Sequence, residues 1–153
     1  VLPEKKLGEL SGSGTDDETG VERAELCSRH THVDFALASF NNRVKNGRMS
    51  KIVGFVANKL GFWGIGIGSE QGTIEIKKKR RGSKKALEAI IEDMKERGYN
   101  CGKVVISHCR NAEFAESVKS AIQSVWDKAE VKIVHARGLC SYYAEKGGLI
   151  IGF

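Results

Sequence analysis

The densest group of candidate functional side chains lies near the end of the chain, in residues 137–148. The segment reads Arg137-Gly138-Leu139-Cys140-Ser141-Tyr142-Tyr143-Ala144-Glu145-Lys146-Gly147-Gly148. It combines the Arg137 guanidinium and the Ser141 hydroxyl with two adjacent phenols, so it offers a ligand both an apolar wall and polar donors. Glycine-bounded loops before a buried strand often carry binding residues. The same residues equally suit a well-packed loop whose tyrosine hydroxyls bond to the backbone, and both interpretations stay open at this point.

A second candidate is the basic segment, residues 77–85, which reads Lys77-Lys78-Lys79-Arg80-Arg81-Gly82-Ser83-Lys84-Lys85. The chain has 25 Lys+Arg and 19 Asp+Glu, a net charge of +6. Without the seven positive charges of this segment, 18 basic and 19 acidic residues remain, a net charge of −1. Three interpretations fit: a solvated strand end and helix start, a basic nucleic-acid-binding module, or a docking surface for an acidic protein. Nucleic acid is disfavoured because no aromatic residues interleave the charges.

Other patterns argue against metal, nucleotide and catalytic sites. The glycines of Gly64-Ile65-Gly66-Ile67-Gly68 precede a predicted hairpin rather than a helix, so no helix N-terminus points at a phosphate. No G-x-S-x-G elbow is present. Zinc-type paired spacing is absent from the histidines and cysteines, which are His30, His32, His108, His135, Cys27, Cys101, Cys109 and Cys140. We therefore expect a protein that is not an enzyme and needs no metal or cofactor.

The length and composition predict one soluble globular domain. A chain of 153 residues with 41% hydrophobic residues can bury a core without disulfides or metals. No apolar run approaches the roughly 20 residues of a membrane span. The first residues lack the features of a signal peptide, so we expect a cytoplasmic protein with reduced cysteines.

The order of predicted elements indicates an α/β fold, a two-layer mixed β-sheet with helices packed on it. Residues 1–14 are predicted to be a flexible lead-in, and a capping box at residues 15–18 starts a helix that extends to about residue 30. The later helices are predicted to begin at or after the caps Ser50, Ser83 and Asn111. The predicted strands are 33–38, 62–67, 73–77, 104–106, 131–134 and 149–153.

Several short motifs, taken in order, resemble those of the DegV family. They are Gly47-Arg48-Met49-Ser50, Gly72-Thr73-Ile74, Arg81-Gly82-Ser83-Lys84-Lys85, Val104 to His108 with Asn111, and Gly147-Gly148-Leu149 with Ile151-Gly152-Phe153. Each is weak alone, and the ordered set is specific. The resemblance implies a two-lobed protein of which residues 33–153 are the C-terminal α/β lobe and residues 15–32 the connecting helix. The N-terminal lobe is absent from this chain.

The resemblance also implies a function. DegV-like proteins are non-enzymatic carriers that bind one long-chain fatty acid and present it to a fatty-acid kinase. Carried over to this chain, the partner-docking residues are Arg81 and Lys84. The fatty-acid-binding residues are Arg48, Ser50, Arg137, Ser141, Tyr142 and Tyr143.

Two departures from the family pattern affect this interpretation. The family commonly has a proline in the strand that corresponds to residues 64–67, where this chain has Gly-Ile-Gly-Ile. The family's final loop carries a histidine that helps to hold the carboxylate, and Ala144 occupies that position here. The loop's hydroxyls could donate to the carboxylate instead, and Arg137 could pair with it.

Overall fold

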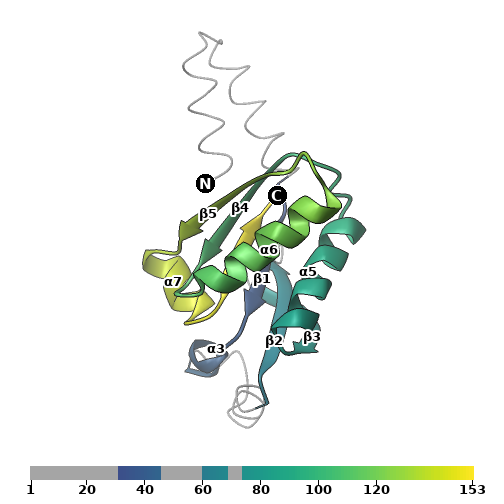
Figure 1. Ribbon diagram of the computed structural model, residues 1–153. Coiled ribbons are helices and arrows are strands. Elements are labelled where there is room, and N and C mark those ends of the chain that lie inside the picture. Colours follow the sequence, from purple (N-terminus) through teal and green to yellow (C-terminus); the bar gives the residue numbers. More distant parts are fainter. Residues whose placement is uncertain (1–30, 46–59, 69–73) are drawn as a thin grey trace, which may run out of the picture.

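The computed structural model describes residues 31–45, 60–68 and 74–153 (Figure 1). The elements, in chain order, are β1 (Val33–Leu37), α3 (Asn41–Lys45), β2 (Phe62–Gly68), β3 (Ile74–Arg81), α5 (Ser83–Glu96), β4 (Lys103–His108), α6 (Ala112–Val125), β5 (Glu130–His135), α7 (Gly138–Ala144) and β6 (Leu149–Gly152).

The described strands form one six-stranded sheet in the order β3-β2-β1-β6-β4-β5. β4 and β5 run parallel, and every other neighbouring pair is antiparallel. Helices α5 and α6 pack side by side on one face of this sheet, while α3 and α7 lie at one end of it (Figure 1). The predicted α/β class, a mixed sheet with helices packed on it, is confirmed.

The core lies between the sheet and the two long helices. Each of the two surfaces is apolar because its apolar residues follow the period of the element, helical on the helices and alternating on the strands. On each long helix, buried apolar residues recur every four positions and therefore lie on one helical face. They are Ala86, Ile90 and Met94 on α5, and Phe114, Val118 and Ile122 on α6. The strands alternate instead, and contribute Ala36, Ile65, Val104, Ile106, Leu149 and Ile151. Burial of these side chains fixes the register of the central strands and therefore where their ends lie.

All six predicted strands are present, and β3 is longer than predicted, because it continues through the basic segment to Arg81. The predicted cap at Ser83 is wrong: the helix begins at Ser83, and Gly82, with φ 81°, is its N-cap. A glycine suits that left-handed conformation at no steric cost.

Residues 138–144 form a helix, α7, where the sequence had indicated a loop. The predicted lead-in 1–14, nearly all of the connecting helix 15–32 and the helix after Ser50 lie outside the described residues.

Gly66 marks a point where the sheet tolerates no side chain. The register between β2 and β3 shifts between Ile65 and Gly66, and a Cβ on Gly66 would lie 2.2 Å from the backbone oxygen of Glu75. We expect Gly66→Ala to lower the free energy of unfolding by about 1–3 kcal/mol through this overlap. Gly68→Ala on the same strand is the control, since its Cβ would meet nothing within 4 Å. Urea unfolding of both variants checks this, and equal stability of the two would contradict it.

Among the described helices, none combines the length and the hydropathy that crossing a membrane requires.

Candidate functional site

The candidate site lies at the carboxyl ends of the parallel strands β4 and β5, where α7 follows β5. A cavity of about 600 Å³ opens there. Carboxyl ends of parallel strands are a common place for ligand sites in α/β proteins. We call this cavity the strand-end cavity. Its polar and charged lining residues are His108, Arg110, His135, Ser141, Tyr142 and Lys146.

Helix α7 brings part of the predicted site to the strand-end cavity. Ser141 and Tyr142 line the cavity, and the Tyr142 side chain is 45% exposed. The Ser141 hydroxyl donates to the Gly138 carbonyl at 2.8 Å, so it serves its own helix in this state. Tyr143 packs edge-on against Tyr142 with ring centroids 5.2 Å apart, and exposed Arg137 is the N-cap residue of α7. Neither Arg137 nor Tyr143 lines the cavity. Predicted residues Arg48 and Ser50 lie outside the described residues.

On the side of α7 that faces α3, Glu145 holds the two helices together. It is 8% exposed, and its carboxylate accepts hydrogen bonds from the Ser39 hydroxyl and from the backbone N–H groups of Asn41 (3.1 Å) and Asn42 (2.6 Å). The Asn42 amide donates in turn to the Tyr142 carbonyl at 2.6 Å. Glu145 therefore caps α3 and fixes its position relative to α7.

Two histidines meet in the strand-end cavity because each ends one of the parallel strands. His108 and His135 are register partners in the β4–β5 pair, and their ring centroids are 4.4 Å apart. His108 is only 3% exposed, and its Nδ1 accepts a hydrogen bond from the Asn111 N–H at 3.2 Å. Burial, and secondly the charge of His135, lowers the pKa of His108 below its usual value. The ring is therefore neutral at pH 7, with its proton on Nε2.

The loops around the strand-end cavity are tied down by backbone hydrogen bonds. Cys109 exchanges N–H···O bonds with residues 147 and 148 at 2.8 and 2.9 Å, and the Ala136 N–H donates to the His108 carbonyl at 2.9 Å. The Asn111 amide also donates to the Gly147 carbonyl at 2.8 Å. The two described non-glycine residues with positive φ, Arg110 (53°) and Glu145 (56°), flank this region. Such conformations persist only where the surroundings enforce them, so the cavity wall is a defined structure.

No role at this cavity was predicted from sequence for five residues, which are His108, Arg110, His135, Glu145 and Lys146. One signal was available: two short buried strands, each ending in histidine and each followed by a helix, predict that both histidines come together at one edge of a sheet. Nothing in the sequence pattern indicates that Glu145 bonds to residues about 100 positions earlier.

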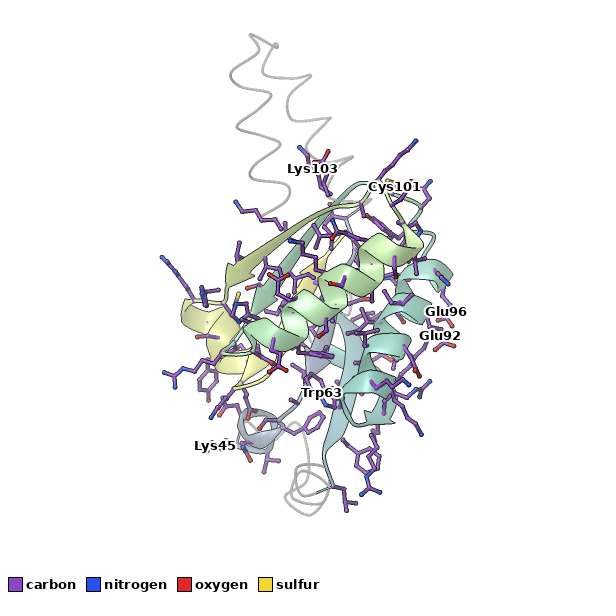
Figure 2. The ribbon with its side chains drawn as sticks, viewed as in Figure 1. Lys45, Trp63, Glu92, Glu96, Cys101 and Lys103 are labelled. Carbon is purple, nitrogen blue, oxygen red and sulfur yellow. The ribbon has the colours of Figure 1, made fainter. Side chains whose placement is uncertain are left out.

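The basic segment has three of its seven charges neutralised by acids. Because β3 alternates, Lys78 and Arg80 face α5, where Lys78 pairs with Glu92 and Glu96 at 3.0 Å each and Arg80 lies 3.7 Å from Glu92. The two glutamates lie one turn apart on α5 (Figure 2). Lys77 pairs with Glu75. Within the described part of the chain, no carboxylate pairs with the other four cations, which are Lys79, Arg81, Lys84 and Lys85.

Metal-ligating side chains do not gather in the described regions, where no group of three His, Cys, Asp or Glu residues could hold an ion. Cys101, Cys109 and Cys140 are free thiols, and Cys27 lies outside the described residues.

Known proteins are similar to this chain in both sequence and fold. The family model described as "Uncharacterised protein, DegV family" matches residues 5–153. A DegV domain-containing protein of Streptococcus pyogenes serotype M3 is 39% identical over 148 residues, which are 97% of this chain and 53% of that protein. The chain spans about half the length of the curated relatives it matches.

Solved structures agree with this assignment. The Streptococcus pneumoniae Fatty Acid Kinase (Fak) B3 protein loaded with linoleic acid superposes with a TM-score of 0.92 and 37% identity, over 99% of this chain and 54% of that one. A DegV family protein from Eubacterium eligens loaded with heptadecanoic acid gives a TM-score of 0.90 and 33% identity, over 99% of this chain and 55% of that one. The chain therefore belongs to the DegV family.

Proposed function

We propose that this chain is one lobe of a fatty-acid-binding protein that presents a long-chain fatty acid to a fatty-acid kinase. The observation that carries the proposal is the similarity, at 37% identity and a TM-score of 0.92, to a protein loaded with linoleic acid. The strand-end cavity and the tyrosines of α7 supply an amphipathic surface suited to such a ligand. On this proposal the protein is a cytoplasmic binding component and not an enzyme.

The proposal assigns the acyl site to two lobes. Arg48, Ser50, Arg137, Ser141, Tyr142 and Tyr143 are the fatty-acid-binding residues proposed for this lobe. The relatives are about twice as long as this chain, and we infer that the other lobe supplies the rest of the apolar tunnel. This chain alone should then bind a fatty acid weakly, because much of the contact area would be missing.

Denaturing mass spectrometry tests the proposal on protein purified with both lobes, alongside this chain purified alone. We expect the two-lobed protein to release one long-chain fatty acid and to gain thermal stability with oleate or palmitate. The single chain should retain little ligand. A two-lobed protein that releases no fatty acid, and whose melting temperature is unchanged by either lipid, would exclude the function.

Arg81 and Lys84 are the residues proposed to dock the kinase. Both are exposed where β3 turns into α5, and neither pairs with a carboxylate among the described residues. We expect Arg81→Ala to reduce kinase-dependent turnover about 10-fold or more, as the loss of a charged interface contact does, with the bound fatty-acid content unchanged. Turnover is measured as ADP release by the kinase. Lys128→Ala, an exposed cation between α6 and β5, is the control, and equal turnover of the two variants would refute the docking role.

The alternative, a nucleic-acid-binding module, is weakened by the ion pairs of the basic segment. Lys78 and Arg80 point toward the glutamates of α5, so these two cations are not on the exposed face of β3, which Lys77, Lys79 and Arg81 share. A phosphate-backbone site would show steep weakening between roughly 50 and 200 mM salt. We expect no binding of RNA or DNA at the lower salt concentration.

A further inference from the structure

The outer edge of the sheet at β5 has a cavity of its own. β5 is the last strand in the sheet order, so one side of it has no neighbouring strand among the described residues (Figure 1). A cavity of about 460 Å³ lies at this edge and is lined by residues of α6, β4 and β5. We call it the edge groove, and its cationic lining residues are Lys103 on β4, Lys119 on α6 and Lys132 on β5.

We propose that the edge groove binds an extended, acidic segment of a protein partner, which adds to the sheet as a further strand beside β5. Strand addition of this kind takes its affinity from backbone hydrogen bonds and its specificity from the side chains beside the edge. The inference goes beyond the proposed fatty-acid function and does not depend on it.

The backbone of β5 offers hydrogen-bonding groups along this edge. In a parallel pair, alternate residues point both their N–H and their C=O toward the neighbouring strand. The Glu130 N–H donates to the Gly102 carbonyl at 2.9 Å, and the register is constant along the pair, so the even-numbered residues of β5 face β4. Val131 and Ile133 therefore direct their N–H and C=O groups outward, where an added strand would bond to them.

The apolar side chains beside this edge are incompletely covered. Val104 and Ile106 on β4 are fully buried, whereas Val131 and Ile133, their register partners on β5, are only partly buried. Val134, on the other face of β5, is partly buried as well. An added strand would cover these side chains on both faces of the sheet, and the apolar area removed from water would stabilise the complex.

The charge of the edge groove selects the kind of strand that is added. Three lysines and one glutamate, Glu130, line the groove, which gives it a net charge of +2. Within the described ranges no carboxylate pairs with Lys132, and Lys119 lies 4.0 Å from Glu116 at the helix surface. A second copy of this chain would bring the same net positive groove against this one, and lysines on edge strands oppose such self-pairing. An acidic segment would instead bring opposite charges together.

The positions of the lysines also define the pattern of the segment. Lys119 lies on the α6 side of β5, and Lys132 lies on the opposite face, because neighbouring side chains of a strand alternate. Apolar side chains of β5 are present on both faces as well. We therefore expect a segment that carries acidic and apolar residues on each of its two faces.

The test is a titration of the 153-residue chain with capped eight-residue peptides, followed through its backbone ¹H–¹⁵N signals. The acidic probe is Glu-Glu-Val-Val repeated once, which places both residue types on each face. One control peptide has lysine in place of glutamate, and the other is the acidic peptide N-methylated at its four valines, which removes backbone donors from both edges. We expect saturable binding of the acidic probe and at least about 10-fold weaker binding of both controls.

Hydrogen exchange shows whether the peptide adds as a strand. With the acidic probe bound, exchange of the Val131 and Ile133 amides should slow about 10-fold or more, because these N–H groups gain acceptors. The amides of Lys132 and Val134, which already face β4, should change little.

Charge variants complete the test. Lys119→Glu and Lys132→Glu should each weaken binding of the acidic probe about 10-fold or more, whereas Lys85→Glu, exposed in the first turn of α5 and outside the edge groove, should not. The proposal is overturned if the acidic probe does not saturate, if either control peptide binds as tightly, if the two outward amides stay unprotected, or if the variants bind like the control. Sedimentation of the chain alone completes the set, because a dimer in which these two amides are protected would make a second copy the occupant and overturn the proposal as well.

Discussion

Replacing Glu145 with alanine is expected to lower the free energy of unfolding by about 3 kcal/mol and to release α3 from α7. The carboxylate accepts from the Ser39 hydroxyl and from two backbone N–H groups of α3 while only 8% exposed. Hydrogen bonds to a charged group contribute about 1.5–3 kcal/mol, and removing the acceptor leaves donors without a partner. The residues concerned are about 100 positions apart in the sequence, so the loss affects tertiary structure rather than one local turn.

Matched variants separate these contributions. Glu145→Gln keeps the shape of the side chain and one neutral acceptor, so it should lower the free energy of unfolding by less than Glu145→Ala does. Ser39→Ala removes one of the three donors and should lower the free energy of unfolding by about 1 kcal/mol. Glu88→Ala, at an exposed position on α5, is the control. Urea unfolding gives the stabilities, and hydrogen exchange at the Asn41 and Asn42 amides reports on α3. If Glu145→Ala is as stable as Glu88→Ala, the carboxylate does not hold the two helices together.

The helices and strands that cover the core could be predicted from sequence because their apolar periods are unambiguous. A spacing of four residues puts side chains on one face only if the segment is a helix. Ile90 and Met94 on α5 have this spacing, as do Val118 and Ile122 on α6. Helix α7 was missed because its residues 138–144 show no such period and begin with glycine. What holds α7 is the contact of the residue that follows it, Glu145, with α3, and a long-range contact leaves no local pattern.

The candidate site was predictable only where chemistry is local in the sequence. Ser141 and Tyr142 could be singled out as neighbours in one segment, and both line the strand-end cavity. The meeting of His108 with His135 depends on the parallel pairing of β4 with β5, which the sequence allows but does not specify. The charge count singled out the basic segment, yet its ion pairs with Glu92 and Glu96 depend on α5 packing beside β3.

A second buried charge cluster lies away from the cavity, where β1 meets the end of α5. Asp34 is fully buried and Asp93 is 6% exposed. Both carboxyls approach Arg97, which is bonded to Asp34 and lies 4.0 Å from Asp93. The Arg97 guanidinium also contacts His32 Nδ1 at 3.0 Å. Within the described ranges, one oxygen of each carboxyl has no hydrogen-bond partner, so a single arginine serves two acids.

This arrangement makes the stability depend on pH in a defined direction. Burial first, and then the charge of Asp93, raises the pKa of Asp34 from 3.8 to about 7, against the opposing effect of Arg97. Between about pH 4 and pH 7 the folded protein therefore keeps a proton that the unfolded chain has lost. Stability contributed by this group falls as pH rises through that window, with a slope of up to about 1.4 kcal/mol per pH unit.

Asp34→Asn is expected to remove this slope, because the amide carries no charge at any pH in the window. The variant should gain stability relative to the natural chain as pH rises from 5 to 8, whatever offset the lost Arg97 contact introduces. Urea unfolding at the two pH values gives the difference, which should change by more than about 1 kcal/mol. For the control Glu88→Gln, on the exposed face of α5, the stability difference from the natural chain should change much less between the two pH values. A difference for Asp34→Asn that stays constant between pH 5 and 8 would mean that Arg97 keeps Asp34 ionised throughout, and that the cluster is an ion pair rather than a proton-holding site.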